Sequence, residues 1–280
     1  MRILPLLLSA AAALAVGPGL RRTLIDGGHT VANYRGQPLP TPLGIIVVAA
    51  AALTVGALGF LYEVGITDEV PTLGAAFVFG VAVFGVFDDA YSGGSRGWRG
   101  HGDAVMKGAI PTGALKAIGT LGLAAWFAYG SEPHDFLRYL LVVLILVLST
   151  NLFNIIDLGP GRAVKTFVIL VIALTIAPHG GDLFKGFGAY VGAVLVVGVY
   201  DLREQGMLGD TGANVIGAVA GLWLSSTITS TGGLVAAVVI LAAITAYGEF
   251  RSISAFVERT PGLRHLDSVG RIQTRKDAAA

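Results

Sequence analysis

Long, continuous runs of apolar residues dominate the chain and alternate with short polar segments. A helix needs about 20 mostly apolar residues to cross the hydrocarbon core of a bilayer, so each run is a candidate membrane span. The runs are rich in alanine and leucine and do not alternate with polar residues, which favours helices over strands. Nine spans are predicted, at residues 3–20, 41–61, 70–87, 108–130, 136–156, 163–178, 187–200, 211–228 and 232–250.

Composition points to the same class of protein. Of 280 residues, 54% are apolar and 13% are charged, and the mean hydropathy is +0.74. A soluble domain cannot bury this much apolar surface, so membrane lipid must be part of the solvent. We therefore expect an all-α, polytopic transmembrane bundle over residues 1–250 and a basic cytoplasmic C-terminal tail over residues 251–280. No basic stripe with interleaved aromatic residues is present, so no nucleic-acid partner is expected.

Lysine and arginine predict the orientation of the bundle. With the N-terminus outside, 16 of the 19 lysines and arginines fall on the inner side, and Arg2, Arg138 and Lys185 fall on the outer side. Because cytoplasmic loops of membrane proteins are enriched in these residues, we expect a cytoplasmic C-terminus and a location in the plasma (inner) membrane. Arg21 and Arg22 follow the first run, which reverses the charge pattern of a cleaved signal peptide.

Carboxylates gather at the predicted cytoplasmic ends of the spans. Asp88 and Asp89 end the third span, Asp157 ends the fifth, Asp201 closes the seventh and Asp210 opens the eighth. Any one of these residues is more simply interpreted as an ordinary interfacial helix end. Together they indicate a polar site, because ionised groups are costly at membrane depth and adjacent carboxylates repel unless a cation lies between them.

The neighbours of these carboxylates suggest what the site binds. Asn151, Asn154 and Asp157 follow one another at a spacing of three residues, which places neighbours in the series on one face of a helix. Amide and carboxylate oxygens suit a hard cation, Mg²⁺ or alternatively Mn²⁺. Lys116 and Arg162 lie near Gly-rich helix starts, where free amides attract anions, although Arg162 is equally well explained as an inside-positive anchor. A phosphorylated substrate reached from the cytoplasm is therefore expected.

Three ordered segments resemble the signature motifs of the polyprenyl-phosphate N-acetylhexosamine-1-phosphate transferases. They are VFGVFDD at 83–89, NLFNIID at 151–157 and MLGDTGAN at 207–214, and the resemblance covers most of the chain. It implies that the phosphate of a polyprenyl phosphate attacks the β-phosphorus of a UDP-amino sugar and releases UMP, in cell-envelope glycan synthesis. The implied role of Asp210 is that of a metal ligand. Asp88 would deprotonate or orient the lipid phosphate, and Asp89 beside it would give support or contact the metal. Nucleotide or metal would be bound by Asn151, Asn154 and Asp157, and phosphate would be contacted by Lys116 and Arg162.

Two departures from the family pattern keep other functions open. The second motif usually continues with a further acidic residue, whereas Leu158 and Gly159 follow Asp157 here, and the late cytoplasmic loop has only His265 where a histidine cluster is common. A non-catalytic relative that binds lipid phosphate or nucleotide is one alternative. An ion-coupled transporter is another, because carboxylates and Gly-interrupted helices also build carriers. Helix faces rich in small residues would permit a homodimer.

Overall fold

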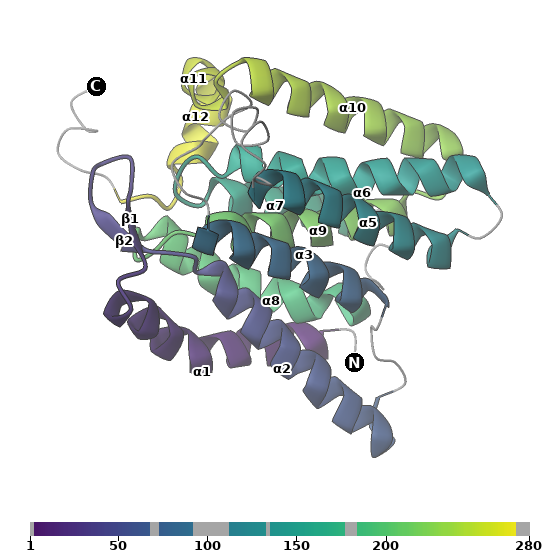
Figure 1. Ribbon diagram of the computed structural model, residues 1–280, viewed down its shortest axis with the longest axis horizontal. Coiled ribbons are helices and arrows are strands. Elements are labelled where there is room, and N and C mark those ends of the chain that lie inside the picture. The colour runs from purple at the N-terminus through teal and green to yellow at the C-terminus, as the bar shows by residue number, and fades with distance from the viewer. Residues whose placement is uncertain (1–2, 68–72, 92–111, 133–134, 177–183, 273–280) are drawn as a thin grey trace.

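The computed structural model describes residues 3–67, 73–91, 112–132, 135–176 and 184–272. These residues form a bundle of helices with one short hairpin at its edge (Figure 1). The long helices are α1 (Leu4–Asp26), α2 (Gly44–Glu63), α3 (Leu73–Tyr91), α5 (Thr112–Ser131), α6 (Phe136–Ile156), α7 (Arg162–Ile176), α8 (Phe184–Leu202), α9 (Gly209–Thr227) and α10 (Thr231–Phe250). The short elements are β1 (Thr30–Ala32), β2 (Pro38–Pro40), α11 (Ile253–Arg259) and α12 (Pro261–Ser268).

The long helices overlap the nine predicted ranges, of which residues 70–72, 108–111 and 177–178 lie outside the described part of the chain. Within the described residues, six of them are long and apolar enough to cross a membrane, namely α1, α2, α3, α6, α8 and α10. Helix α7 has 15 described residues, and the described parts of α5 and α9 are long enough but less apolar. The helical, membrane-type fold is thus confirmed, whereas the number of spans and their orientation stay predictions.

A two-stranded hairpin between α1 and α2 was not expected from the sequence. β1 and β2 pair antiparallel, with Val31 opposite Leu39. The side chain of Asn33 closes the turn, because its Oδ1 accepts hydrogen bonds from the backbone amides of Arg35 and Gln37, both at 2.9 Å. Each strand has only three residues and no alternating apolar pattern, so the periodicity of the sequence carries no signal for it.

Helix α9 is the centre of the bundle, and it packs against α2, α3, α6 and α7. All but five of its 19 residues are buried. Glycine makes this packing close: a Cβ atom at Gly44 would lie 2.1 Å from the backbone nitrogen of Gly212, and one at Gly217 would lie 2.6 Å from the carbonyl oxygen of Ser149. The neighbouring helices therefore pack directly against the backbone of α9, which fixes the position of its first turn.

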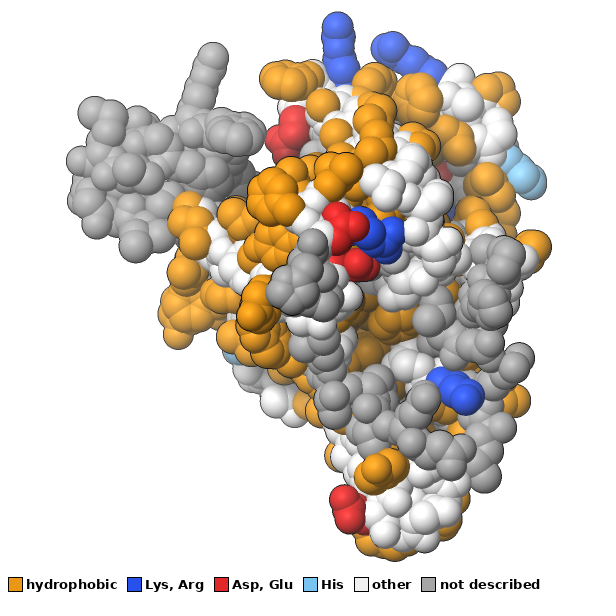
Figure 2. All heavy atoms as spheres, turned by 90° about the vertical axis from the view of Figure 1, so that its right-hand side faces the viewer, with side chains coloured by type: hydrophobic (Ala, Val, Ile, Leu, Met, Phe, Trp, Pro, Cys, Tyr) orange, Lys and Arg blue, Asp and Glu red, His pale blue; other side chains and the backbone are white. Residues whose placement is uncertain are grey.

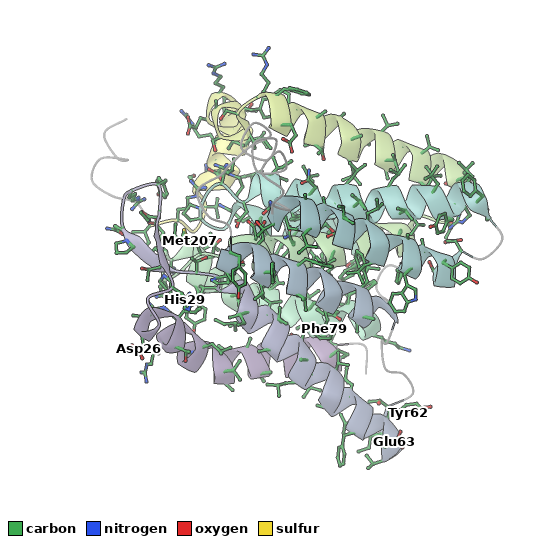
Figure 3. All side chains as sticks on the ribbon, viewed as in Figure 1. Asp26, His29, Tyr62, Glu63, Phe79 and Met207 are labelled. Carbon is green, nitrogen blue, oxygen red and sulfur yellow. The ribbon has the colours of Figure 1, made fainter. Side chains whose placement is uncertain are left out.

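The two ends of the bundle differ in charge. Figure 3 places Asp26, His29 and Met207 at one end, and Tyr62 and Glu63 at the far end of α2. Figure 2 views the molecule from the right-hand side of Figure 1 and shows mostly hydrophobic side chains with a few charged ones among them. The long helices alternate in direction, so the start of α6 and the start of α8 lie at the same end of the bundle as Tyr62 and Glu63. Arg138 and Lys185 are the two described basic residues at that end. The charge asymmetry predicted from the sequence is therefore present in the described structure.

Candidate active site at the charged end of the bundle

The side chains of Asp88, Lys116 and Asp210 meet where α3 ends and where α5 and α9 begin. The Nζ atom of Lys116 lies 2.7 Å from Oδ2 of Asp88 and 2.5 Å from Oδ2 of Asp210. The side chain of Asp88 is 9% exposed and that of Asp210 is 34% exposed, so the cluster is sheltered but open on the side of Asp210. Three residues that the sequence marked in separate segments thus share one site.

Asp89 fixes the start of α9 rather than facing the same cation. Its Oδ1 accepts a hydrogen bond from the amide of Asp210 at 2.9 Å, and its Oδ2 accepts hydrogen bonds from the amide and the hydroxyl group of Thr211 at 2.8 and 2.6 Å. The first amides of a helix have no partner within it, so this carboxylate acts as a cap supplied by another helix. Asp89 therefore holds Asp210 in place, and its role as a metal contact stays a prediction.

A glycine is required just before Asp210. Gly209 has a φ of +68°, which L side chains rarely adopt. A Cβ atom there would also lie 2.6 Å from Cβ of Pro42 and 2.9 Å from Oδ1 of Asp89. The glycine in the segment MLGDTGAN thus lets the chain turn tightly into α9 beneath the capping carboxylate.

The hairpin holds the connection between α8 and α9. Glu204 lies on this connection, and its side chain is only 4% exposed. It accepts hydrogen bonds from Nδ2 of Asn33 at 3.0 Å and from the hydroxyl group of Tyr34 at 3.2 Å, and it pairs with Arg35 at 3.3 Å. Its backbone has a φ of +49°, a left-handed conformation that the surrounding contacts must stabilise. The hairpin therefore braces the segment that leads to Asp210.

Asp157 and Asp201 form a second acidic group beside the first. Asp157 directly follows α6, and among the described residues its carboxylate has no hydrogen-bond or ion-pair partner. Burial raises the pKa of Asp157 well above its ordinary value, and the negative charge of Asp201 adds to this shift. Asp201 accepts a hydrogen bond from the amide of Gly161 at 2.7 Å, which ties α8 to the start of α7.

The two predicted amides lie on α6 before Asp157. Asn151 is exposed and Asn154 is half-buried, and neither side chain has a hydrogen bond to another described residue. Within the described residues, both side-chain amides are therefore available to a ligand. Their predicted role in nucleotide or metal binding stays a prediction.

Arg162 is engaged by the C-terminal segment. Its guanidinium group forms a two-pronged ion pair with Asp267, at 3.0 and 3.2 Å, and donates a hydrogen bond to Oγ of Ser254 at 3.0 Å. Arg271 contacts the same carboxylate at 2.8 Å, and Nζ of Lys165 donates to backbone carbonyl groups at the end of α12. A ligand phosphate would therefore have to share Arg162 with Asp267 or displace it.

An apolar cavity of about 380 Å³ opens next to Arg162. It lies between α6, α7, α10, α11 and α12, and its lining is almost entirely hydrophobic. The lining residues are Ile156, Arg162, Thr166, Ala243, Ile244, Tyr247, Ile253, Phe256, Val257 and Leu263. The cavity thus combines a hydrocarbon-like wall with one cation, which suits a ligand that is apolar at one end and anionic at the other.

The carboxylates of this region offer few ligands for the predicted metal ion. Among the residues that the structure describes, no group of three or more His, Asp or Glu side chains is arranged to hold a metal ion. Asp88 and Asp210 nevertheless offer hard oxygen ligands, and both face the same cation, Lys116. Mg²⁺ is commonly held by one or two carboxylates together with substrate phosphates and water. Lys116 lies between the two carboxylates in the described structure, so a Mg²⁺ ion held by Asp210 stays a prediction.

Sequence reasoning missed three residues of this region. Thr211 lies within a marked segment but carries no charge, and Glu204 belongs to no motif. Asp267 is 105 residues from Arg162, in a segment interpreted as a tail. No protein-family model matches the sequence, and no curated protein matches it either. The function therefore has to be inferred from the geometry of the site and from its motifs.

Proposed function

We propose that the protein transfers a sugar-1-phosphate of the N-acetylhexosamine class from a UDP-sugar to polyprenyl phosphate at the cytoplasmic face of the plasma membrane, with release of UMP. The observation that carries this proposal is the bridge of Lys116 between Asp88 and Asp210. Two of these residues lie in segments that resemble motifs of the polyprenyl-phosphate N-acetylhexosamine-1-phosphate transferases. Phosphoryl transfer needs this kind of site, because it depends on positioning and on charge neutralisation more than on covalent chemistry.

The reaction assigns a role to each member of the bridge. An oxygen of the lipid phosphate forms a bond to the β-phosphorus of the UDP-sugar, and the bond from that phosphorus to the bridging oxygen breaks. Asp88 would orient the lipid phosphate and take its remaining proton. Lys116 would contact the phosphates and neutralise the negative charge that builds up on the leaving UMP. Its ammonium group is already held between two carboxylates, so little reorganisation is needed.

The metal ion and the nucleotide would bind beside the bridge that Lys116 forms between Asp88 and Asp210. Asp210 would hold Mg²⁺, or Mn²⁺ in its place, and Asp89 would keep Asp210 in position. When bound, the metal ion would neutralise charge on the diphosphate. Asn151, Asn154 and Asp157 would contact the nucleotide or the ion from the end of α6.

The apolar cavity supports a lipid acceptor. Its wall of aliphatic and aromatic side chains suits a prenyl chain, and Arg162 at its edge would contact the phosphate group. One wall of the cavity is α10, which is apolar enough to span a membrane, so a lipid would enter the cavity from the bilayer.

A non-catalytic relative is the second candidate function. The observation that favours it is the ion pair between Arg162 and Asp267, because a predicted phosphate contact is already satisfied within the chain. An ion-coupled carrier is less well supported, since the acidic residues lie at helix ends and carriers place such groups near the middle of the membrane.

The deciding experiment follows UMP release by purified protein supplied with undecaprenyl phosphate, Mg²⁺ and a panel of UDP-sugars. We expect UMP with one class of UDP-amino sugar, and none with EDTA or in the variants Asp88→Asn and Asp210→Asn. Asp26→Asn, an exposed carboxylate at the same end of the bundle, is the matched control and should retain activity. Nucleotide binding without UMP release would favour the non-catalytic relative, and substrate flux into sealed vesicles would favour the carrier.

A further inference from the structure

The C-terminal helix α12 exposes apolar residues beside charged ones and turns its one acidic side chain inward. Its apolar residues Leu263 and Leu266 are 37% and 48% exposed, whereas the side chain of its acidic residue Asp267 is only 11% exposed. Asp267 turns inward to the guanidinium groups of Arg162 and Arg271. A surface helix in water buries its apolar stripe and exposes its charges. The exposed face of α12 is therefore amphipathic, with leucines beside Arg264 and His265.

The same apolar surface continues onto the neighbouring helices. Phe256 of α11 is 47% exposed, and Phe250 at the end of α10 is 86% exposed. Further along α10, Ile240 and Ile244 also lie on the surface. Figure 1 shows α11 and α12 at one end of α10, on the outside of the bundle. Because α10 is apolar enough to span the membrane, its exposed side meets lipid, and the exposed sides of α11 and α12 extend that surface.

Basic residues flank this surface. Arg251, Arg259 and Arg264 are exposed, and none of them has an ion pair with another described residue. Glu249 and Glu258 are the exposed acidic residues beside them, so basic residues outnumber acidic ones. Long arginine side chains at such positions lay their stems along apolar surface and carry the charge to the headgroup level. Apolar residues with arginines at their edge are the pattern of an interfacial helix on an anionic leaflet.

We propose that α11 and α12 form a docking surface for the anionic phospholipids of the surrounding leaflet. Phe256, Leu263 and Leu266 enter the acyl region, and Arg259 and Arg264 bind phosphate headgroups. The buried charges of Arg162, Asp267 and Arg271 hold the helix pair in the orientation that this requires. Phe256 and Leu263 also line the cavity proposed for the prenyl chain, so the tests use Leu266, Arg259 and Arg264, which do not line it.

The first test measures where α12 lies relative to lipid. The chain has no cysteine, so Leu266→Cys can be spin-labelled alone in the full-length protein. In nanodiscs of phosphatidylglycerol and phosphatidylcholine, we expect the label to collide more often with oxygen than with a water-soluble nickel chelate. A label at Gln37→Cys, exposed on the hairpin, is the matched control and should show the opposite preference. Equal nickel accessibility at both positions would overturn the proposal.

The second test concerns the headgroups. An arginine near an anionic surface changes lipid affinity by about fivefold, so Arg259→Gln combined with Arg264→Gln should lower the retained ratio of phosphatidylglycerol to phosphatidylcholine severalfold. The ratio is measured by mass spectrometry of lipid that copurifies with the protein. Arg22→Gln, an exposed arginine on α1, should leave the ratio unchanged. An unchanged ratio in the double variant would refute headgroup binding, and it would leave the transferase proposal untouched because UMP release is not the readout.

Discussion

The carboxylate of Asp89, at the end of α3, accepts hydrogen bonds from both the amide and the hydroxyl group of Thr211, in the first turn of α9. Removing a helix cap costs about 1–2 kcal/mol, so Asp89→Ala should lower the free energy of unfolding by that amount. It should also lower UMP release, because Asp210 is no longer held in place. Stability is measured by denaturation in detergent micelles.

A cap at the opposite end of the bundle separates the two effects. Asp135 caps α6 by accepting a hydrogen bond from the amide of Arg138 at 3.0 Å. Asp135→Ala should lose a comparable amount of stability and retain UMP release per folded molecule. If Asp89→Ala also retained full activity, Asp89 would have no part in positioning Asp210.

Lys116 keeps two carboxylates together. Replacing it by glutamine leaves Asp88 and Asp210 without their shared cation, and breaking a sheltered ion pair in this way costs about 3 kcal/mol. A divalent cation can then occupy the gap, so the melting temperature of Lys116→Gln should rise with Mg²⁺ more steeply than that of the unmodified protein. Lys165→Gln removes another cation at the same end and should show no such Mg²⁺ dependence. Equal Mg²⁺ responses in all three proteins would contradict a cation site between the carboxylates.

Alanine substitutions at Gly209 and Gly28 distinguish the cost of a strained backbone from the cost of a steric clash. Both have a φ near +70°, at which an alanine costs about 1–2 kcal/mol. A Cβ atom at Gly28 meets nothing within 4 Å, whereas one at Gly209 collides with Pro42 and Asp89. Gly209→Ala should therefore destabilise the protein clearly more than Gly28→Ala, and only the former should reduce UMP release. Equal losses of stability would show that the turn before Asp210 can relax.

The raised pKa of Asp157 predicts a pH-dependent penalty. A carboxyl whose pKa is higher in the folded than in the unfolded protein destabilises the fold once the unfolded form ionises, above about pH 4. Asp157→Asn should therefore raise the melting temperature at pH 7, and the difference should vanish towards pH 4. Asp26→Asn, at the exposed end of α1, provides the control. A lower melting temperature of Asp157→Asn at pH 7 would mean that a bound cation stabilises the ionised form.

The apolar cavity can be filled from α10. Ala243 lines it, so Ala243→Phe should raise the KM for the lipid acceptor severalfold and leave the KM for the UDP-sugar unchanged. Ala236→Phe, two turns earlier on α10 and exposed, should affect neither constant. Equal values for Ala243→Phe and the unmodified protein would place the prenyl chain elsewhere.

The positions of the long helices could be predicted from sequence because each one is a continuous apolar run. Such a run identifies a helix but does not show its neighbours. The run at 211–228 carries no direct sign that it is the buried centre, since its small residues also suit a lipid-facing helix. Its low apolarity is the one indirect sign, because a helix surrounded by protein need not match lipid.

Part of the candidate site could also be predicted. Asp88 and Asp210 are predicted because several carboxylates gather at the predicted helix ends, and Lys116 because it lies near a Gly-rich helix start. The structure brings these three side chains together. The partner of Arg162 could not be predicted, because the contact with Asp267 depends on how α12 folds back onto α7. The capping role of Asp89 likewise arises from the relative position of two helices, which local spacing does not encode.

The burial of α9 has a consequence for biosynthesis. The helices that enclose it, α2, α3, α6 and α7, all precede it in the chain and leave the ribosome first. Until residues 209–227 are made, these helices have no common partner, and Asp89 has no amide groups to cap. The packing around α9 can therefore be completed only late in translation. If synthesis stops before α9, we expect the incomplete protein to be bound by chaperones and degraded by membrane proteases.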